Sequence, residues 1–205
     1  MATKKAELTP MQQQYRQIKD QNQDCILFFR LGDFYEMFEE DAQVASRELD
    51  LTLTTRDRGK PKEEQTPMCG IPYHSVDAYI ARLVQKGYKV AISEQVTDPA
   101  TTKGLVEREV TRTITPGTVT DSCMLEESKN NYFACLYGSG QKFGLAFCDI
   151  STGAFYVTVC DDAPTALSEL GRFAPTEILR FGSDVHSEAF DDCLIRRLSC
   201  CWTEA

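Results

Sequence analysis

The feature that most constrains the fold is the stretch 27–38, where an apolar run meets a glycine and then a group of aromatic and acidic residues. The apolar run before Gly32 is short and aromatic, which predicts a buried strand. Gly32 lets the backbone turn. Apolar residues recur at helical spacing over 37–49, which predicts a helix. Phe34 and Glu36 are therefore expected at a strand-to-helix junction, where rigid flanks display their side chains to a partner.

The length and composition limit the class of protein. The chain has 205 residues, enough for one large domain or two small ones. No apolar run is long enough to cross a bilayer, and the N-terminal lysines precede no apolar segment of a secretory signal, so a cytoplasmic location is expected. The nine cysteines lack metal-ligand spacing, and most are expected to be small core side chains.

The charge is unevenly distributed along the chain. The net charge is −9, which argues against a simple electrostatic nucleic-acid binder. Residues 1–120 carry 16 Lys and Arg against 18 Asp and Glu, whereas residues 121–205 carry 6 against 13. This difference suggests two domains with different roles.

The first 120 residues alternate helical and extended patterns. Thr9 and Pro10 begin a helix, as N-cap and first helical residue. A charged loop over 56–66 and a turn-rich connector over 68–74 are expected. A helix from residue 76 should end before Gly87. The expected strands are 25–29, 50–54, 88–95 and 107–115.

The pattern changes after a polar linker. Three short strands separated by glycine turns predict an antiparallel meander, followed by a helix and another strand. That order is the opening of a ribonuclease H-like α/β domain. The tail from residue 187 lacks a convincing final helix, which suggests a fragment of a longer protein. The expected strands are 132–137, 143–149, 154–159 and 177–181, and the expected helix is 164–173.

Three ordinary interpretations apply to the residues from Asp33 to Glu36. Their spacing matches a helix-capping box, in which each side chain accepts from the backbone of the other residue. Phe34 alone is more often a core residue than a wedge. The two carboxylates could also form a general acid–base pair, but no nucleophile or metal ligand accompanies them.

The other candidate motifs are weaker. The basic loop with Arg56, Arg58, Lys60 and Lys62 is either a solvated loop or a set of phosphate contacts. His74 stands alone, and a surface or packing histidine is the ordinary interpretation. The sequence contains no G-x-x-x-x-G-K-[ST] loop, no G-x-S-x-G elbow and no H-E-x-x-H motif.

Several strings together resemble the MutS family of bacterial DNA mismatch sensors. The string Gly32-Asp33-Phe34-Tyr35-Glu36-Met37-Phe38 is similar to its mismatch-reading Phe-x-Glu motif, and the string from Pro67 to His74 to its second signature. Glu94-Gln95, Asp98-Pro99, Val106-Glu107-Arg108 and Thr113 to Thr118 resemble the third signature. The matching strings run in order from residue 9 to about 118, and Asp149-Ile150-Ser151-Thr152-Gly153 resembles a string of the family's connector domain.

The resemblance implies a mixed α/β fold in two domains. Residues 1–118 would be the mismatch-recognition domain, a mixed sheet wrapped by helices, and residues 119–130 a linker. Residues 131–205 would begin the ribonuclease H-like connector domain, incomplete here. In the family this domain has no nuclease role, in keeping with the lack of a carboxylate in 132–137.

The resemblance also implies roles for individual residues. Phe34 would enter from the minor groove and stack on a mispaired or unpaired base, and Glu36 would hydrogen-bond that base. Basic residues would contact the DNA backbone, whereas Gly32, Gly70 and Pro72 would shape the chain. The expected DNA- or mismatch-binding residues are Phe34, Glu36, Arg56, Arg58, Arg108, Met68 and His74.

The implied partners are mismatched double-stranded DNA and, through the connector domain, MutL. The full-length family forms homodimers, is located in the cytoplasm at the nucleoid, and carries an ATPase that uses ATP and Mg²⁺. No cofactor and no catalytic residue are expected within this chain, which alone should bind DNA weakly. Two rival functions remain open: a protein-interaction module using the acidic half, and a metal-dependent nuclease.

Overall fold

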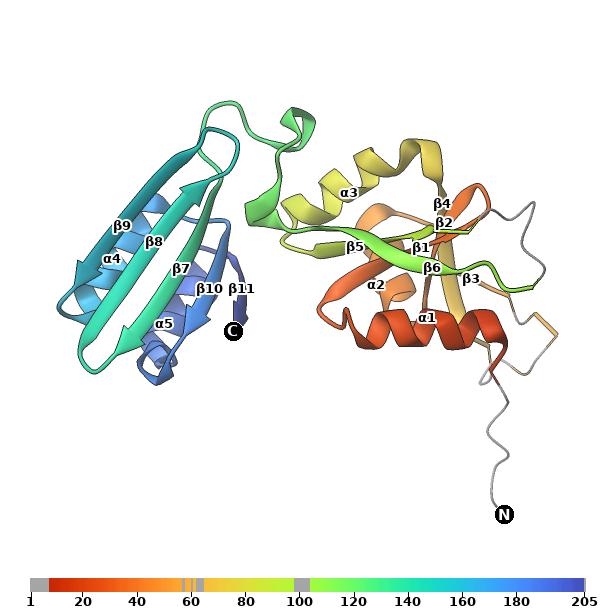
Figure 1. The fold of residues 1–205 in the computed structure, drawn as a ribbon, viewed down its shortest axis with the longest axis horizontal. Helices are drawn as coiled ribbons and strands as arrows, with labels where there is room; N and C mark the ends of the chain where they lie inside the picture. The colour runs from red at the N-terminus through yellow and green to blue at the C-terminus, as the bar shows by residue number, and fades with distance from the viewer. Residues whose placement is uncertain (1–7, 57, 60, 62–64, 98–103, 205) are drawn as a thin grey trace, which may run out of the picture. The chain divides into compact units, whose positions relative to one another are not determined.

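The computed structural model describes residues 8–56, 58, 59, 61, 65–97 and 104–204. The chain forms two compact units (Figure 1). One comprises the chain up to residue 83 together with 89–113, and the other comprises 84–88 and the chain from residue 114 onward. The predicted mixed α/β class is confirmed, because each unit pairs one mixed sheet with helices.

The first unit is built on a six-stranded sheet in the order β3-β4-β2-β1-β5-β6. Strand β1 runs antiparallel to β2 and parallel to β5, and β2 runs antiparallel to β4. The strands are β1 Cys25–Leu31, β2 Phe34–Phe38, β3 Thr54–Thr55, β4 Pro67–Pro72, β5 Lys89–Gln95 and β6 Arg108–Ile114.

Helices cover both faces of this sheet. Helix α1 (Pro10–Asp20) begins at the predicted Thr9 cap, where a capping box with Gln12 closes the first turn. Its Tyr15 ring packs edge-on against Phe29 and Phe38 on one face. Helix α2 (Glu39–Leu49) lies against β4 on the opposite face of the sheet, where the Cys69 thiol donates to the Ala42 carbonyl. Helix α3 (Val76–Gln85) is followed by Gly87, whose φ is 86°.

Asp41 joins three elements of the first unit. Strand β2 pairs only with the last three residues of β1, so the backbone N–H of Leu27 lacks a strand partner on that side. Asp41 Oδ2 accepts this N–H at 3.0 Å, and Oδ1 lies 2.9 Å from Lys19 Nζ. The Tyr15 hydroxyl also donates to Asp41. This buried carboxylate therefore holds α1, β1 and the start of α2 together.

The second unit has a five-stranded sheet in the order β11-β10-β7-β8-β9. Strands β7, β8 and β9 form the predicted antiparallel meander, and β10 and β11 run parallel to β7. Helix α4 connects β9 to β10. This is the strand and helix order predicted from the sequence. The elements are β7 Tyr132–Ser139, β8 Lys142–Asp149, β9 Ala154–Cys160, α4 Ala163–Phe173, β10 Glu177–Phe181, α5 Glu188–Asp191 and β11 Cys201–Glu204.

Three predictions about elements are wrong. The segment 68–74 is not a connector, because most of it lies in strand β4. In place of the predicted strand 50–54, the chain has the two-residue strand β3, Thr54–Thr55. The helix predicted over 37–49 begins at Glu39, so Phe34 and Glu36 lie on strand β2. The tail, for which no element was predicted, contains α5, a π-helical turn over Asp192–Arg197 and strand β11.

No helix in the described part of the chain is long and apolar enough to span a membrane.

Candidate functional site

The hairpin of β1 and β2 places Phe34 directly after a tight turn. Leu31 pairs with Phe34, so Gly32 and Asp33 form a two-residue loop. Gly32 has a φ of 60°, and Asp33 has no positive φ, which is the pattern of a type II′ turn. Phe34 follows as the first residue of β2, with 46% of its surface exposed.

Phe34 and Glu36 share one face of the sheet because side chains alternate along a strand. Phe38, on the same face, is buried beneath Tyr15 of α1. Glu36 pairs in register with Gly70 of β4, which contributes no side chain. Helix α1 therefore covers the Phe38 end of this face. Phe34 is exposed at the other end, and the Glu36 side chain between them is only 14% exposed.

The Glu36 carboxylate has one paired oxygen and one unpaired oxygen. Oε1 lies 3.2 Å from an amino group of Arg56. Oε2 is buried and has no hydrogen-bond partner within the described residues. Burial raises the pKa of Glu36, and the neighbouring Arg56 opposes that rise. An unpaired buried carboxylate oxygen is costly, so a hydrogen-bond donor that reached this atom would relieve that cost.

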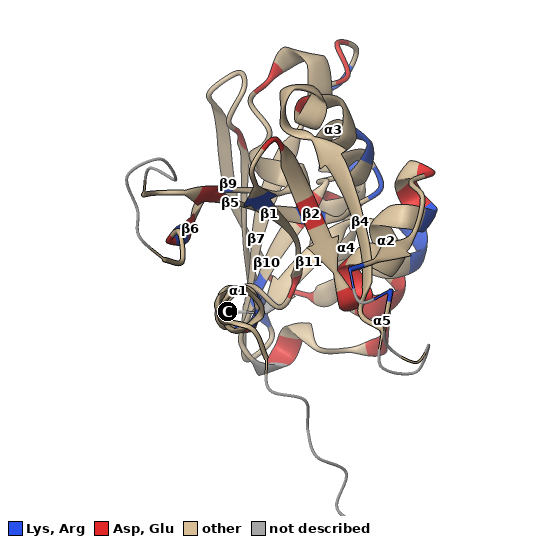
Figure 2. Cartoon of the chain, turned by 90° about the vertical axis from the view of Figure 1, so that its right-hand side faces the viewer, with Lys and Arg blue, Asp and Glu red and all other residues tan. Residues whose placement is uncertain are grey.

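The predicted phosphate-binding residues have different environments. Arg56 and Arg58 are exposed, and Arg58 also lies 3.5 Å from the Thr54 hydroxyl. Lys60 and Lys62 lie outside the described residues. In Figure 2 the basic segments are scattered and do not gather into one continuous patch over β1, β2 and β4.

Arg108 is not presented for a phosphate contact, contrary to its predicted role. Its side chain is buried, with Nε donating to the Arg30 carbonyl at 2.6 Å and one amino group donating to Gln14 and to the Val106 carbonyl. The guanidinium also lies 4.9 Å from the centre of the Phe29 ring. These contacts give Arg108 a structural role that joins α1, β1 and β6.

Met68 and His74 flank the candidate site in different ways. Met68 pairs with Phe38, so it lies on the same face of the sheet as the site, and it packs against the apolar cluster beneath α1. His74 is exposed in the 3₁₀ turn Tyr73–Ser75, with its ring edge-on to that of Tyr73.

The capping-box interpretation of Asp33 and Glu36 is wrong. Asp33 lies in the hairpin loop, and α2 begins six residues after it, at Glu39, with Phe38 as an N-cap that makes no side-chain hydrogen bond. Glu39 instead adopts a positive φ of 53° where the chain leaves β2.

The sequence analysis missed residues on the opposite face of this hairpin. Arg30 stacks on Tyr73, with its guanidinium carbon 3.9 Å from the ring centre, and Tyr35 donates to Glu94. Only the alternation of side chains along β1 and β2 could have indicated that Arg30 and Tyr35 share a face.

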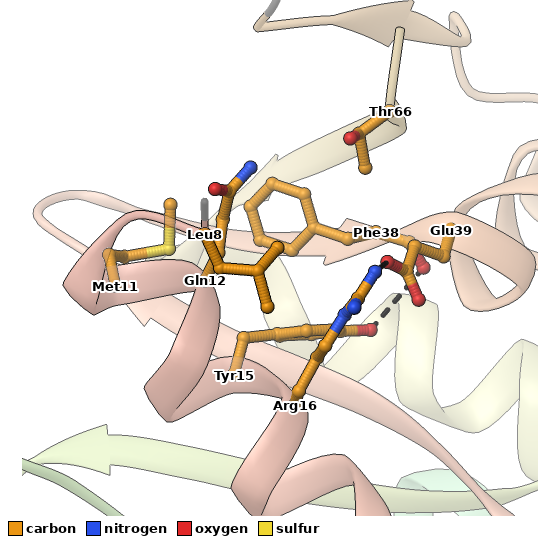
Figure 3. Close-up of a pocket in the computed structure, with 8 residues that line it drawn as sticks. All are labelled: Leu8, Met11, Gln12, Tyr15, Arg16, Phe38, Glu39 and Thr66. Carbon is orange, nitrogen blue, oxygen red and sulfur yellow. Dashed lines mark hydrogen bonds and ion pairs between the residues drawn. The ribbon is translucent and has the colours of Figure 1, made fainter. Parts of the chain in front are cut away.

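A small pocket lies at the covered end of the site, between α1 and the start of α2 (Figure 3). Arg16 and Glu39 form an ion pair of 2.8 Å across it, and the Tyr15 hydroxyl donates to the Phe38 carbonyl. Burial raises the pKa of Tyr15, so its hydroxyl remains a donor. The pocket is lined by Leu8, Met11, Gln12, Tyr15, Arg16, Phe38, Glu39 and Thr66.

The Asp149 carboxylate of the second unit, which bears on the rival nuclease function, is used by its own turn. Asp149 Oδ1 accepts from Ser151 and Thr152, and Oδ2 accepts from the Asn131 N–H. Burial alone would raise the pKa of Asp149, but these hydrogen bonds outweigh it and lower the pKa. The string Asp149 to Gly153 therefore shapes the β8–β9 turn. In the described part of the chain, no group of three or more His, Cys, Asp or Glu side chains could hold a metal ion.

Comparison with known proteins identifies the family. The family models MutS domain I and MutS domain II match residues 9–123 and 131–203. The DNA mismatch repair protein MutS of Acetivibrio thermocellus is 54% identical over 195 residues, which cover 94% of this chain and 22% of that protein. MutS of Ruminiclostridium cellulolyticum is 58% identical over 175 residues, covering 84% and 20%. MutS of Staphylococcus saprophyticus is 52% identical over 191 residues, covering 93% and 21%. This chain thus spans about a fifth of the length of these relatives, and it belongs to the MutS family of DNA mismatch repair proteins.

Proposed function

We propose that this chain recognises mismatched and unpaired bases in duplex DNA, with Phe34 as the group that enters the base stack. The observation that carries the proposal is the adjacency of Phe34 and Glu36 on the half of the sheet face that α1 does not cover, where the buried Glu36 Oε2 has no partner in the described chain. An exposed aromatic ring alone is common on protein surfaces. Beside an unpaired acceptor it forms a site for a base.

Insertion of Phe34 would test how easily the duplex deforms. Unstacking a base step costs about a few kcal/mol, and a mismatched step has already lost part of its pairing and stacking. Stacking on an aromatic ring contributes roughly 1–3 kcal/mol and accepts any base. The selectivity would therefore come from the lesion and not from the sequence.

Glu36 would add a second level of selectivity. As a carboxylate it can accept an N–H of thymine or guanine, and when protonated it can donate to a purine N7. The raised pKa of Glu36 favours the second use more than an ordinary glutamate would. Against intact duplex the same carboxylate is repelled by phosphates, so it would disfavour binding to matched DNA.

The exposed basic residues Arg56 and Arg58 would position the DNA backbone, since arginine neutralises phosphates without reading sequence. Met68 would pack beside Phe38 at the covered end of the site's face, and His74 would flank the DNA. Because residues 1–120 carry a net charge of only −2, we infer that this chain alone binds DNA weakly.

The remaining activities belong to the full-length protein. We infer that it is a homodimeric, DNA-dependent ATPase of the cytoplasm and nucleoid, with ATP and Mg²⁺ bound outside the residues of this chain. We also infer a division into a mismatch-recognition domain over 1–118, a linker over 119–130 and a connector domain over 131–205.

The second unit offers a surface for the MutL partner. Phe155, Val157 and Val159 alternate along the edge strand β9 and are 64–70% exposed. Contiguous exposed apolar side chains typically mark interaction surfaces. We expect Val157→Lys, in a full-length MutS protein, to reduce MutL pull-down. Asp161→Lys, a change at an exposed neighbouring position, should leave capture unchanged, and equal capture by both variants would contradict this assignment.

The main proposal is tested by fluorescence anisotropy with this chain in the context of a full-length MutS protein. Phe34→Ala should abolish the preference for mismatched over matched duplex and leave the salt-sensitive background binding. Phe155→Ala, which removes another exposed phenylalanine, is the matched control and should retain the preference. A retained preference in Phe34→Ala would contradict the proposal.

A further inference from the structure

The Phe34 ring is exposed, and helix α1, which packs on the same face of the sheet, does not cover it. It follows the loop of Gly32 and Asp33 and lies beyond the reach of α1. A ring that enters DNA must resist the cost of unstacking, about a few kcal/mol per step. The backbone that carries Phe34 must therefore be held in place by contacts on the opposite face of the sheet.

Arg30 holds the hairpin loop from that opposite face. Its Nε donates to the Gly32 carbonyl at 2.5 Å, and its guanidinium lies over the Tyr73 ring at 3.9 Å. The Tyr73 backbone N–H in turn donates to the Asp33 carbonyl at 3.0 Å. Both carbonyls of the two-residue loop therefore have donors that come from outside the loop itself.

Tyr35 and Glu94 extend this support to β5. Tyr35 follows Phe34 directly, is buried, and donates its hydroxyl to Glu94 Oε1. Glu94 Oε2 lies 3.8 Å from the Arg30 guanidinium, whose carbon is also 5.4 Å from the Tyr35 ring centre. Burial, together with the hydrogen bond to Glu94, raises the pKa of Tyr35 to about 12, so the hydroxyl remains a donor at neutral pH.

We propose that Arg30, Tyr35 and Glu94 form a positioning network that holds the backbone of Phe34 rigid while the ring enters a mismatched step. The inference rests on the proposed function of Phe34. None of the three residues touches the base. They act through the backbone of the loop and of β2, by linking β1, β2 and β5 beneath the ring.

A merely structural role would give a different result. If the network only stabilised the fold, Tyr35→Phe would lower the melting temperature and leave the ratio of mismatched to matched affinity unchanged. If the network positions Phe34, the same change should lower that ratio even though the protein is folded. A less rigid backbone lets the ring move, which raises the free energy of inserting it into the base stack. The ratio is the readout that separates the two roles.

The test measures dissociation constants for mismatched and matched duplex with this chain in a full-length MutS protein. Tyr35→Phe should lower the affinity ratio about three- to ten-fold, the effect of one hydrogen bond, with matched-duplex affinity unchanged. Glu94→Gln, which keeps an acceptor for Tyr35 but loses the charge facing Arg30, should lower it less. Tyr137→Phe, at an exposed tyrosine of the second unit, is the matched control and should change nothing.

A double-mutant cycle with Phe34→Ala decides between the proposals. In the Phe34→Ala background, Tyr35→Phe should leave the affinity for mismatched duplex unchanged. An unchanged ratio for both Tyr35→Phe and Glu94→Gln in the native background, or an equal loss of mismatched-duplex affinity with and without Phe34, would overturn the positioning network. A normal ratio in Phe34→Ala itself would instead overturn the proposed function. If Tyr35→Phe does not fold, Glu94→Gln carries the same cycle.

Discussion

The Glu36 carboxylate contacts Arg56 through only one of its oxygens: Oε1 lies 3.2 Å from the guanidinium, and Oε2 is buried without a partner in the described chain. An arginine could have paired with both oxygens in a bidentate arrangement. The side chain of Arg56 is nearly half exposed, so it can turn to a phosphate. In the free protein Arg56 therefore offsets part of the Glu36 charge, and when Arg56 turns to a phosphate Glu36 loses this partner.

The first prediction concerns Glu36→Ala. If Glu36 repels intact duplex and bonds a mispaired base, its removal should lower affinity for mismatched duplex about ten-fold and leave affinity for matched duplex equal or higher. Anisotropy titrations of both duplexes with the full-length protein measure this. Equal losses on the two duplexes would show that Glu36 contributes only general affinity.

Glu36→Gln should increase stability, with a defined pH dependence. Because burial raises the pKa of Glu36 in the folded chain, its ionised form opposes folding, and the stability linked to this group is lost as pH rises through the folded pKa. At about pH 8 we expect a melting temperature about 1–3 °C higher in the variant, and below the ordinary value of 4.5 we expect no difference. Thermal unfolding at both pH values measures the gain. A destabilised variant at pH 8 would contradict the stated cause.

Arg108 and Arg58 should respond differently to substitution. Arg108→Gln removes the charge and the hydrogen bonds to Arg30, Gln14 and Val106, so we expect a loss of roughly 1–3 kcal/mol in unfolding free energy and no change in the salt dependence of DNA binding. Arg58→Gln should leave stability within about 0.5 kcal/mol and reduce the salt slope by about 1. Urea denaturation and binding at several salt concentrations distinguish the two. A reduced salt slope in Arg108→Gln would restore its predicted role in phosphate contact.

Asp41 should be one of the most sensitive polar positions of the first unit. Asp41→Ala leaves the Leu27 N–H and Lys19 without their partner, which we expect to cost about 2–4 kcal/mol. Asp161→Ala removes an exposed carboxylate that faces Lys142 and should cost less than about 0.5 kcal/mol. Urea unfolding followed by circular dichroism compares them, and similar midpoints for both would mean that Asp41 does not join the three elements.

The elements of the second unit could be predicted closely from the sequence. Strands β7, β8 and β9 are short runs rich in apolar and aromatic residues and are separated by glycine turns, so their composition and length are both local signals. Strand β10 and helix α4 were equally well marked. The tail was not, because α5 spans only four residues and β11 is recognisable only from its pairing with β10.

The candidate site was harder to predict because its geometry depends on pairing across the sheet. Strand β4 contains Gly70 and begins and ends with proline, so its sequence resembles a turn, although proline is tolerated at strand ends. The start of α2 has no side-chain cap to mark it. The burial of Arg108 arises from Gln14 and Arg30, which are distant in sequence, and no local pattern could indicate it.

The most direct test of the account is whether Phe34 itself unstacks a mismatched base. A duplex carrying 2-aminopurine beside a mismatch should brighten when the full-length protein binds, because this base fluoresces more strongly when unstacked. We predict an increase with the native protein on mismatched duplex, little or none on matched duplex, and none on either duplex with Phe34→Ala. An equal increase with Phe34→Ala would contradict the claim that Phe34 is the group that enters the stack.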